Sequence, residues 1–327
     1  MRFVLRRLGF FVLTLWAALT LNFFLPRLMP GNPALAAIGN HRGALSPDAL
    51  KVMEAQFGVG HQNIASQYFR YLGDVATFKF GSSLTTQPGN SVGRIVLDAI
   101  PWTLGLVGLT TVLAFVLGTG IGIVGAWRRG GRLDSIMPPI FVIMTVIPYF
   151  WIGLILILIV GVKLRLLPYF FSYDITLAPG FNLTFIGNVL EHAILPSFTL
   201  LVTTIGTWIL TMRNNMITTL AEDYVRMARA KGLPSRRIMF DYAARNAVLP
   251  NLTGFAMSLG FVIAGSILVE YVFNYPGLGY LLYNAVQNTD YPLMQALFML
   301  FTLAVLVAVL LCDLATAWLD PRARSKG

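Results

Sequence analysis

The sequence predicts an all-α, polytopic membrane protein with six transmembrane helices. Hydrophobic residues make up 56% of the chain and charged residues 12%, which leaves too few polar side chains to cover a water-soluble surface. The apolar residues gather into six runs, each suited to a membrane helix of about 20 residues. One of these runs contains the single cysteine, Cys312, so the sequence offers no disulfide framework.

The distribution of positive charge orients the predicted helices. The expected spans are residues 8–28, 102–127, 136–162, 195–210, 252–272 and 293–319. Sixteen of the 24 Lys and Arg residues lie in the two terminal tails and in the segments after the second and fourth spans. Cytoplasmic loops carry an excess of Lys and Arg, so both termini are predicted to be cytoplasmic. The same rule explains the net charge of +10 without a nucleic-acid partner.

The N-terminal segment, residues 1–30, is predicted to be a short tail and the first membrane helix. Arg2, Arg6 and Arg7 before an apolar run, with Ala-Leu-Ala at 34–36, also resemble a secretory signal peptide and its cleavage site. The apolar run is longer than a typical signal core, which favours a retained helix.

The remaining chain divides into an outer insertion and a core. Residues 31–98 are predicted to form an extracytoplasmic subdomain with short helices at 47–57 and 64–72 and a loop at 81–93. Residues 99–327 are predicted to form the core domain with the other five helices.

Motifs for an enzyme are missing from the sequence. It contains no GxxxxGK[ST], HExxH or GxSxG, and its three histidines are far apart. A GxGxxG motif starts at Gly120, but it lies inside an apolar span with no strand before it. Gly118 and Gly122 also form a GxxxG pair, which predicts close helix packing. We therefore expect no catalytic residue, and no metal or cofactor bound by this chain.

Two acidic residues fall within or beside predicted spans, where charge is costly. Glu270 closes the fifth span and is expected either to meet a charged group of a substrate or to hydrogen-bond the turn at 276–279. Asp313 lies near the inner end of the sixth span, where it is expected to pair with a basic residue.

The basic cytoplasmic segment 216–250 is the most informative part of the chain. A helix over 219–231 is predicted to place Leu220, Tyr224, Met227 and Ala228 near one face, with an ion pair between Glu222 and Arg226. Gly232 and Pro234 predict a turn, and a second helix then leads to a hinge at Leu249 and Pro250. Such a segment is typical of a docking element for another protein. The alternative is an amphipathic helix that lies on anionic lipid.

This segment carries a family resemblance. Its sequences ARAKGL at 228–233 and ARNAVLP at 244–250 resemble the coupling (EAA-type) loop of ABC importer permeases, in the dipeptide/oligopeptide/nickel branch and of its first-permease type. Further landmarks occur in the family's order: LRRLGFFVLTL near the N-terminus, HAILP at 192–196, YPGLG at 275–279, DYP at 290–292 and LDPR at 319–322. The chain departs from the general Glu-Ala-Ala pattern with Arg226-Met227-Ala228.

The resemblance implies a permease subunit in a bacterial cytoplasmic membrane. Its expected partners are a second homologous permease, two ATP-binding subunits or domains that carry ATP and Mg, an extracytoplasmic substrate-binding protein and membrane lipid. The residues expected to contact the ATPase are Tyr224, Arg226, Met227, Ala228, Arg229, Ala230, Lys231, Gly232 and Leu233.

The substrate and its route are less defined. Peptides are expected from the resemblance, with oligosaccharides such as cello-oligomers or nickel as alternatives. Possible pathway or gate residues are Thr103, Thr110, Thr111, Ser258, Ser266 and Glu270, although Ser and Thr in membrane helices often bond their own backbone. An ATP-independent channel or carrier and an intramembrane enzyme remain as other classes, but neither internal repeats nor a catalytic pair is visible in the sequence.

Overall fold

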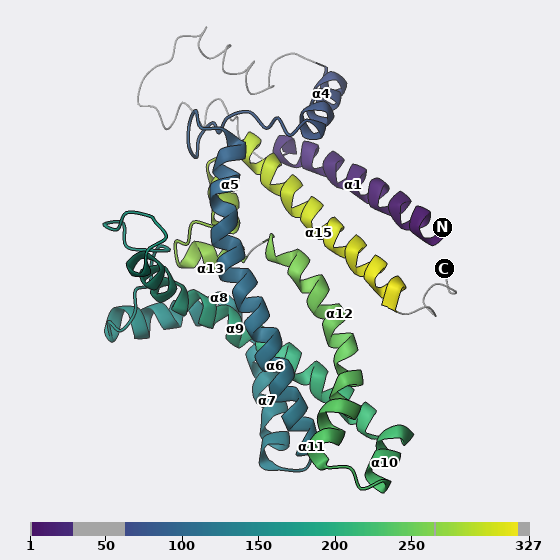
Figure 1. Cartoon of the computed structure of the whole chain (residues 1–327). Helices are drawn as coiled ribbons and strands as arrows, with labels where there is room; N and C mark the ends of the chain where they lie inside the picture. The colour runs from purple at the N-terminus through teal and green to yellow at the C-terminus, as the bar shows by residue number, and fades with distance from the viewer. Residues whose placement is uncertain (1, 29–62, 265, 320–327) are drawn as a thin grey trace. The chain divides into compact units, whose positions relative to one another are not determined.

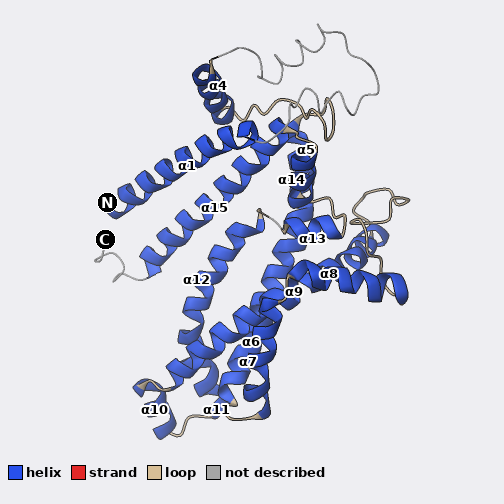
Figure 2. Cartoon of the chain, turned by 180° about the vertical axis from the view of Figure 1, so that it is seen from behind, coloured by secondary structure: helices blue, strands red, loops and turns tan. Residues whose placement is uncertain are grey.

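A computed structural model describes residues 2–28, 63–264 and 266–319. The described chain is helical, and its one β pairing is an isolated bridge between Ser82 and Ser91 (Figure 2). It divides into two compact units. The first comprises Met1–Trp102, Ile263–Ile267 and Pro276–Gly327, and the second comprises Thr103–Val262 and Leu268–Tyr275.

The first unit contains the N-terminal and C-terminal helices. Its elements are α1 (Arg2–Leu28), α4 (Ile64–Ala76), nearly all of α5 (Val92–Thr103), α14 (Leu278–Gln287) and α15 (Tyr291–Leu319). Helix α1 lies along α15, as both Figure 1 and Figure 2 show. Helix α4 confirms the short helix expected at 64–72 and extends it to Ala76. The helix expected at 47–57 lies outside the described residues.

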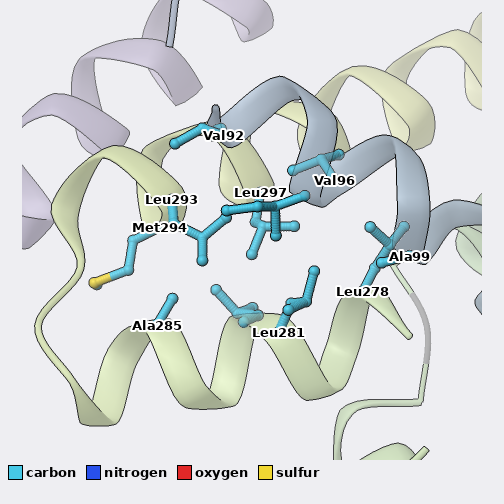
Figure 3. Close-up of a cluster of buried hydrophobic side chains, with 12 residues drawn as sticks. Val92, Val96, Ala99, Leu278, Leu281, Ala285, Leu293, Met294 and Leu297 are labelled. Atoms are coloured by element: carbon cyan, nitrogen blue, oxygen red, sulfur yellow. The ribbon is translucent and has the colours of Figure 1, made fainter. Parts of the chain in front are cut away.

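A buried apolar cluster holds α5, α14 and α15 together (Figure 3). Val92 and Val96 of α5 meet Leu278 of α14 and Leu293 and Leu297 of α15, and all five are buried. The apolar positions recur at helical spacing on each element, so each helix presents one face to this core.

Polar contacts fix α1 to its neighbours. The Asn22 side-chain amide is buried and donates to the Gln295 carbonyl at 2.9 Å and to the Tyr71 hydroxyl at 3.0 Å. The Arg27 guanidinium lies 3.6 Å from the ring centroid of Phe23. Burial raises the pKa of Tyr71 to about 12, so this hydroxyl stays protonated. α1 is therefore held by hydrogen bonds as well as by apolar packing.

Asp290, immediately before α15, anchors the loop that precedes α5. Its Oδ2 accepts from the Ser83 hydroxyl at 2.5 Å and from the backbone N–H groups of Leu84, Thr85 and Thr86 at 3.0–3.2 Å. Its Oδ1 accepts from the Leu293 N–H at 3.4 Å, in the manner of an N-cap. This fully buried carboxylate is thus surrounded by donors, which offset the cost of burying its charge.

The second unit is built on a long helix pair. Its elements are η1 (Leu104–Gly108), α6 (Leu109–Trp127), α7 (Arg132–Val146), α8 (Tyr149–Leu156), η2 (Ile157–Lys163), α9 (Leu183–Leu220), α10 (Asp223–Ala230), α11 (Ser235–Arg237), η3 (Ile238–Ala244), α12 (Arg245–Val262) and most of α13 (Ile267–Val272). The most extensive packing is between α6 and α9.

Two glycines make that close approach possible. A Cβ on Gly118 would lie 2.6 Å from Trp208 Cβ, and one on Gly122 would lie 2.7 Å from the Ile209 carbonyl oxygen. The prediction that the GxxxG pair packs helices is confirmed. Gly120, which belongs only to the GxGxxG motif, has no such neighbour, because a Cβ there would meet nothing within 4 Å.

Membrane-spanning character is confirmed in part. Four described helices are long and apolar enough to cross a membrane: Arg6–Leu25, Val92–Trp127, Leu183–Leu220 and Tyr291–Cys312. A fifth span is present if α7 and α8, bent by 87°, count as one broken span. The expected fifth helix, 252–272, was wrong as a single element, because α12 ends at Val262 and α13 begins only at Ile267. The sequence between them contains Gly265 and Ser266, which are weaker helix formers than Ala or Leu.

The expected fourth span, 195–210, was too short. α9 begins twelve residues earlier and ends ten residues later, because the Asn182 side chain caps its N-terminus by accepting from the Phe185 N–H at 2.8 Å. A run of apolar residues shows which part of a helix can lie in lipid. The helix itself extends beyond that run as far as its capping residues.

Candidate coupling site

The cytoplasmic segment folds into an elbow, which we define as residues 222–237. It contains α10, the turn that follows and α11, and these lie together at one end of the second unit (Figure 1). The single helix expected over 219–231 was wrong at its start. α9 continues to Leu220, and Glu222 then adopts an extended conformation before α10 begins at Asp223.

This boundary changes the expected ion pair. Arg226 lies 3.6 Å from the Asp223 carboxylate, not beside Glu222. Because Glu222 is outside the helix, its spacing of four residues from Arg226 no longer places the two side chains together. Both paired side chains are largely exposed, so their contribution to stability is small.

Gly232 ends α10 with a Schellman motif. Its φ is +69°, its N–H donates to the Arg229 carbonyl at 2.9 Å, and the Leu233 N–H donates to the Ala228 carbonyl at 3.4 Å. These are the two bonds that define the motif, and glycine adopts the left-handed conformation without steric cost. Pro234 then caps α11 and starts the next helical segment.

The inner face of the elbow is a small apolar core. Val225, Ala228 and Ile238 are buried against one another, with Leu233 and Trp127 packed around them. The buried face of α10 is therefore covered by the start of η3 and not by α11, which has no buried residue. α10 is too short to be stable alone, so this contact fixes its direction.

The outer face of α10 is exposed and partly apolar. Tyr224 is 40% exposed and Met227 is 62% exposed. Met227 lies on the side of the helix away from Val225, whereas Tyr224 lies at the edge of the buried face, one turn before Ala228. Arg226 and Arg229 on the same helix are also exposed, and exposed Met, Tyr and Arg side chains are typical of a protein contact surface.

Two contacts brace the elbow against the rest of the second unit. The Asn246 amide of α12 donates to the Tyr224 hydroxyl at 2.9 Å, and the Arg229 guanidinium lies 5.9 Å from the Trp127 ring centroid at the end of α6. Ala243 and Ala247 also pack on Met212 and Met216 of α9. α10 therefore contacts α6 and α12, and η3 and α12 in turn contact α9.

The predicted coupling residues divide between the two faces. Ala228 is buried and Leu233 is half-buried, so these two support the elbow from within. The remaining positions are exposed: Tyr224, Arg226, Met227, Arg229, Ala230, Lys231 and Gly232.

The expected hinge at Leu249 and Pro250 was wrong as the start of a helix. Both residues lie inside α12, which begins at Arg245 and continues the helical path from α11 and η3. Pro250 removes one backbone donor within that helix, but the chain remains helical around it.

Three of the predicted pathway residues bond their own helices. Thr110 donates to the Leu106 carbonyl, Thr111 to the Val107 carbonyl and Ser258 to the Phe255 carbonyl, at 2.6–2.8 Å. These hydroxyls satisfy their own helices. Ser266 lies half-buried between α12 and α13.

Thr103 and Glu270 form a buried pair. Both are fully buried, and the Thr103 hydroxyl donates to Glu270 Oε1 at 2.9 Å. Glu270 thus joins α13 to the last residue of α5 rather than facing an open surface of the second unit. The side chain of Asp313 lies outside the described set.

Sequence reasoning missed three supporting residues. The face predicted for a helix starting at 219 included Leu220 but not Val225. Helical spacing could have found Val225, because it lies three residues before Ala228 and so shares its face. Asn246 and Trp127 come from other helices, and nothing in the local pattern connects them with α10.

Comparison with known proteins identifies the family of the chain. Residues 118–325 match the family model described as the inner membrane component of binding-protein-dependent transport systems. Residues 1–107 match the model for the N-terminal part of such membrane components. The chain belongs to the binding-protein-dependent transport permeases.

Relatives agree over nearly the full length of the permease. It is 31% identical to the dipeptide transport system permease protein DppB of Lactococcus lactis, covering 99% of both chains. It is 34% identical to the di/tripeptide transport system permease protein DppB of Pseudomonas aeruginosa and 31% identical to the oligopeptide transport system permease protein AppB of Bacillus subtilis, covering 98% of each chain.

The family establishes the coarse role of the permease. It is a multi-pass inner-membrane subunit of an ABC importer, and it acts with ATPase and substrate-binding partners. ATP hydrolysis takes place on separate subunits, so the prediction of a transport subunit rather than an enzyme is confirmed.

Proposed function

We propose that the permease forms half of a translocation pathway for peptides, and that a second, homologous permease forms the other half. The names of its relatives support this substrate class, because they specify dipeptides, di/tripeptides and oligopeptides. A chain with few membrane-spanning helices needs a partner to enclose a polar route through lipid.

The elbow is the proposed docking site for the ATPase. The observation that carries this proposal is the exposed pair Tyr224 and Met227 on a short helix whose buried side is held in place by Val225 and Ala228. ATP and Mg would bind to the ATPase and not to this chain. When the ATPase closes around nucleotide, movement of α10 would pass to α12 through Tyr224 and Asn246.

We propose the following topology for the permease in the membrane. Six spans place the basic elbow and both termini in the cytoplasm, because that side carries most of the Lys and Arg residues. Residues 31–98, 181–191 and 274–292 then face outward, where the substrate-binding protein would dock.

Transport by the reconstituted complex tests this function. We would purify the permease with its partners from the native membrane, reconstitute the complex with its binding protein, and measure uptake of labelled dipeptide, cello-oligomer and nickel. The proposal predicts uptake of peptide that requires ATP. Uptake of only the oligosaccharide or nickel would reassign the substrate, and uptake by the permease alone without ATP would replace the importer with a carrier or channel.

A Gly232→Trp variant tests the elbow within the same assay. The turn has space for a side chain at this position. The strain in the variant comes from the positive φ of Gly232, which other residues rarely adopt. We expect the variant to insert into the membrane and to hydrolyse ATP without matching peptide uptake. Unchanged uptake per ATP would remove the elbow from the coupling mechanism.

A further inference from the structure

A pocket in the second unit contains two opposite charges, and one of them, Glu191, is the last residue of the proposed outward-facing segment 181–191. It has a volume of about 460 Å³ and lies between the end of η2 and the first turns of α9. Arg165 and Glu191 both line it. Its size falls in the range of about 300–1,000 Å³ that holds small ligands.

Arg165 occupies a position that suits glycine. Its φ is +52°, and the flanking N–H groups of Leu164 and Leu166 donate back to the Ile159 and Val160 carbonyls at 2.9 and 3.0 Å. An arginine pays a steric penalty in this left-handed conformation. Strained backbone conformations cluster at ligand sites, so the Arg165 side chain is a candidate ligand contact.

The two charges are available for a ligand. Within the described part of the chain, neither Arg165 nor Glu191 has an ion-pair or side-chain hydrogen-bond partner. Tyr169, which also lines the pocket, is held in place, because it packs so tightly on Gly161 that a Cβ there would lie 2.6 Å from its ring. The pocket therefore presents a cation, an anion and an aromatic ring.

Exposed apolar side chains extend from the pocket. Val162 and Leu166 line it and are 47% and 66% exposed, and Leu158 on η2 and Ile194 on α9 are also exposed. The predicted third span ends at residue 162, so this region is expected at the outer boundary of the membrane. Aromatic and charged residues gather at such boundaries.

We propose that this pocket binds the head group of a zwitterionic phospholipid. Arg165 pairs with the phosphate, and Glu191 pairs with the ammonium, which also lies near the face of Tyr169. The acyl chains cover the exposed apolar residues of η2 and α9. A peptide with free termini carries the same two charges but lacks long apolar chains, so the apolar surface favours a lipid.

Lipid retention tests the proposal. The intact transporter would be placed in nanodiscs containing equal amounts of phosphatidylethanolamine and phosphatidylglycerol with identical acyl chains, extracted gently, and analysed by native mass spectrometry. We expect the permease to retain phosphatidylethanolamine over phosphatidylglycerol by about fivefold, the effect of one favourable charge pair. Equal retention of the two lipids by the parent protein would overturn the proposal.

Matched variants locate the effect in the pocket. Arg165→Gly removes the cation and suits the local backbone, so this variant is expected to fold and to retain less of both lipids, because both carry the phosphate. Glu191→Gln should lose the preference for phosphatidylethanolamine, whereas Arg70→Gln, at an exposed position on α4, should keep it. A preference unchanged in Glu191→Gln, or unchanged total retention in Arg165→Gly, would contradict the assignment, and so would displacement of the lipid by a dipeptide with free termini.

Discussion

Gly232 is the residue on which the shape of the elbow depends. Its φ of +69° is left-handed, and no atom lies within 4 Å of the position a Cβ would take. A substitution there is therefore strained by its backbone conformation and not by crowding. Gly232→Ala should weaken the elbow locally by about 1 kcal/mol.

Hydrogen exchange measures this effect at the right place. In Gly232→Ala, the amides of α10 should exchange about fivefold faster. The matched control is Gly187→Ala in α9, where space is also free but φ is not positive, and where alanine favours the helix. Equal exchange in the two variants would mean that the Schellman motif does not hold α10.

Asp290 offers a second test at a single residue. Asp290→Asn keeps the shape of the side chain but removes its negative charge. In the parent protein, four donors of residues 83–86 bond to Oδ2 of this carboxylate. We expect a loss of about 1.5–3 kcal/mol, the range for hydrogen bonds to a charged group. The amides of Leu84, Thr85 and Thr86 should lose protection from hydrogen exchange first.

The control for this substitution is Asp98→Asn. Asp98 is exposed on α5, so its replacement removes a charge of the same sign without breaking a buried network. If Asp98→Asn destabilised the protein as much as Asp290→Asn, net charge and not the loop anchor would be responsible.

At the scale of elements, the α6–α9 contact depends on the two glycines of the GxxxG pair, Gly118 and Gly122. A Cβ on Gly122 would lie 2.7 Å from the Ile209 carbonyl oxygen and 2.8 Å from Met212 Cβ. Backbone atoms cannot move aside without shifting a helix, so Gly122→Ala should cost about 1–3 kcal/mol. Thermal unfolding of the purified permease in detergent would measure the change.

Gly120→Ala is the natural comparison, two residues away in the same helix. It meets nothing within 4 Å and should leave the unfolding midpoint unchanged or slightly raised. A larger loss in Gly120→Ala than in Gly122→Ala would contradict the packing described for α6 and α9.

The sequence predicted which elements form more accurately than the residues at which they begin and end. The two-part elbow and its turn at Gly232 followed from local chemistry, because glycine and proline act on their own backbone. The predicted start of α10 was wrong, because the sequence from Leu220 to Met227 gives no local sign that the helix breaks at Glu222. The supports from Asn246 and Trp127 depend on tertiary contacts, which a local pattern does not contain.

At the scale of the whole molecule, composition and charge were sufficient for the class of protein. An apolar chain with ordered family landmarks identified a membrane permease, and the comparisons confirmed it. The number of spans was harder to predict, because apolar runs do not reveal where a helix bends. The bend between α7 and α8 and the break after Val262 both fall inside such runs.

α10 has an exposed side and a buried side, and this difference allows the most direct test of whether its exposed side contacts the ATPase. In the assembled transporter, with Cys312→Ala to remove the native thiol, Met227→Cys and Val225→Cys would each be labelled with a short photoreactive cross-linker. Met227 is 62% exposed and Val225 is fully buried. The two sites thus differ in face while they share one helix.

The measurement is the identity of the cross-linked product. We expect an adduct between position 227 and the ATPase subunit, with little or none from position 225. Failure of position 227 to reach the ATPase, in a complex that still transports its substrate, would contradict the claim that the exposed face of α10 couples transport to ATP hydrolysis.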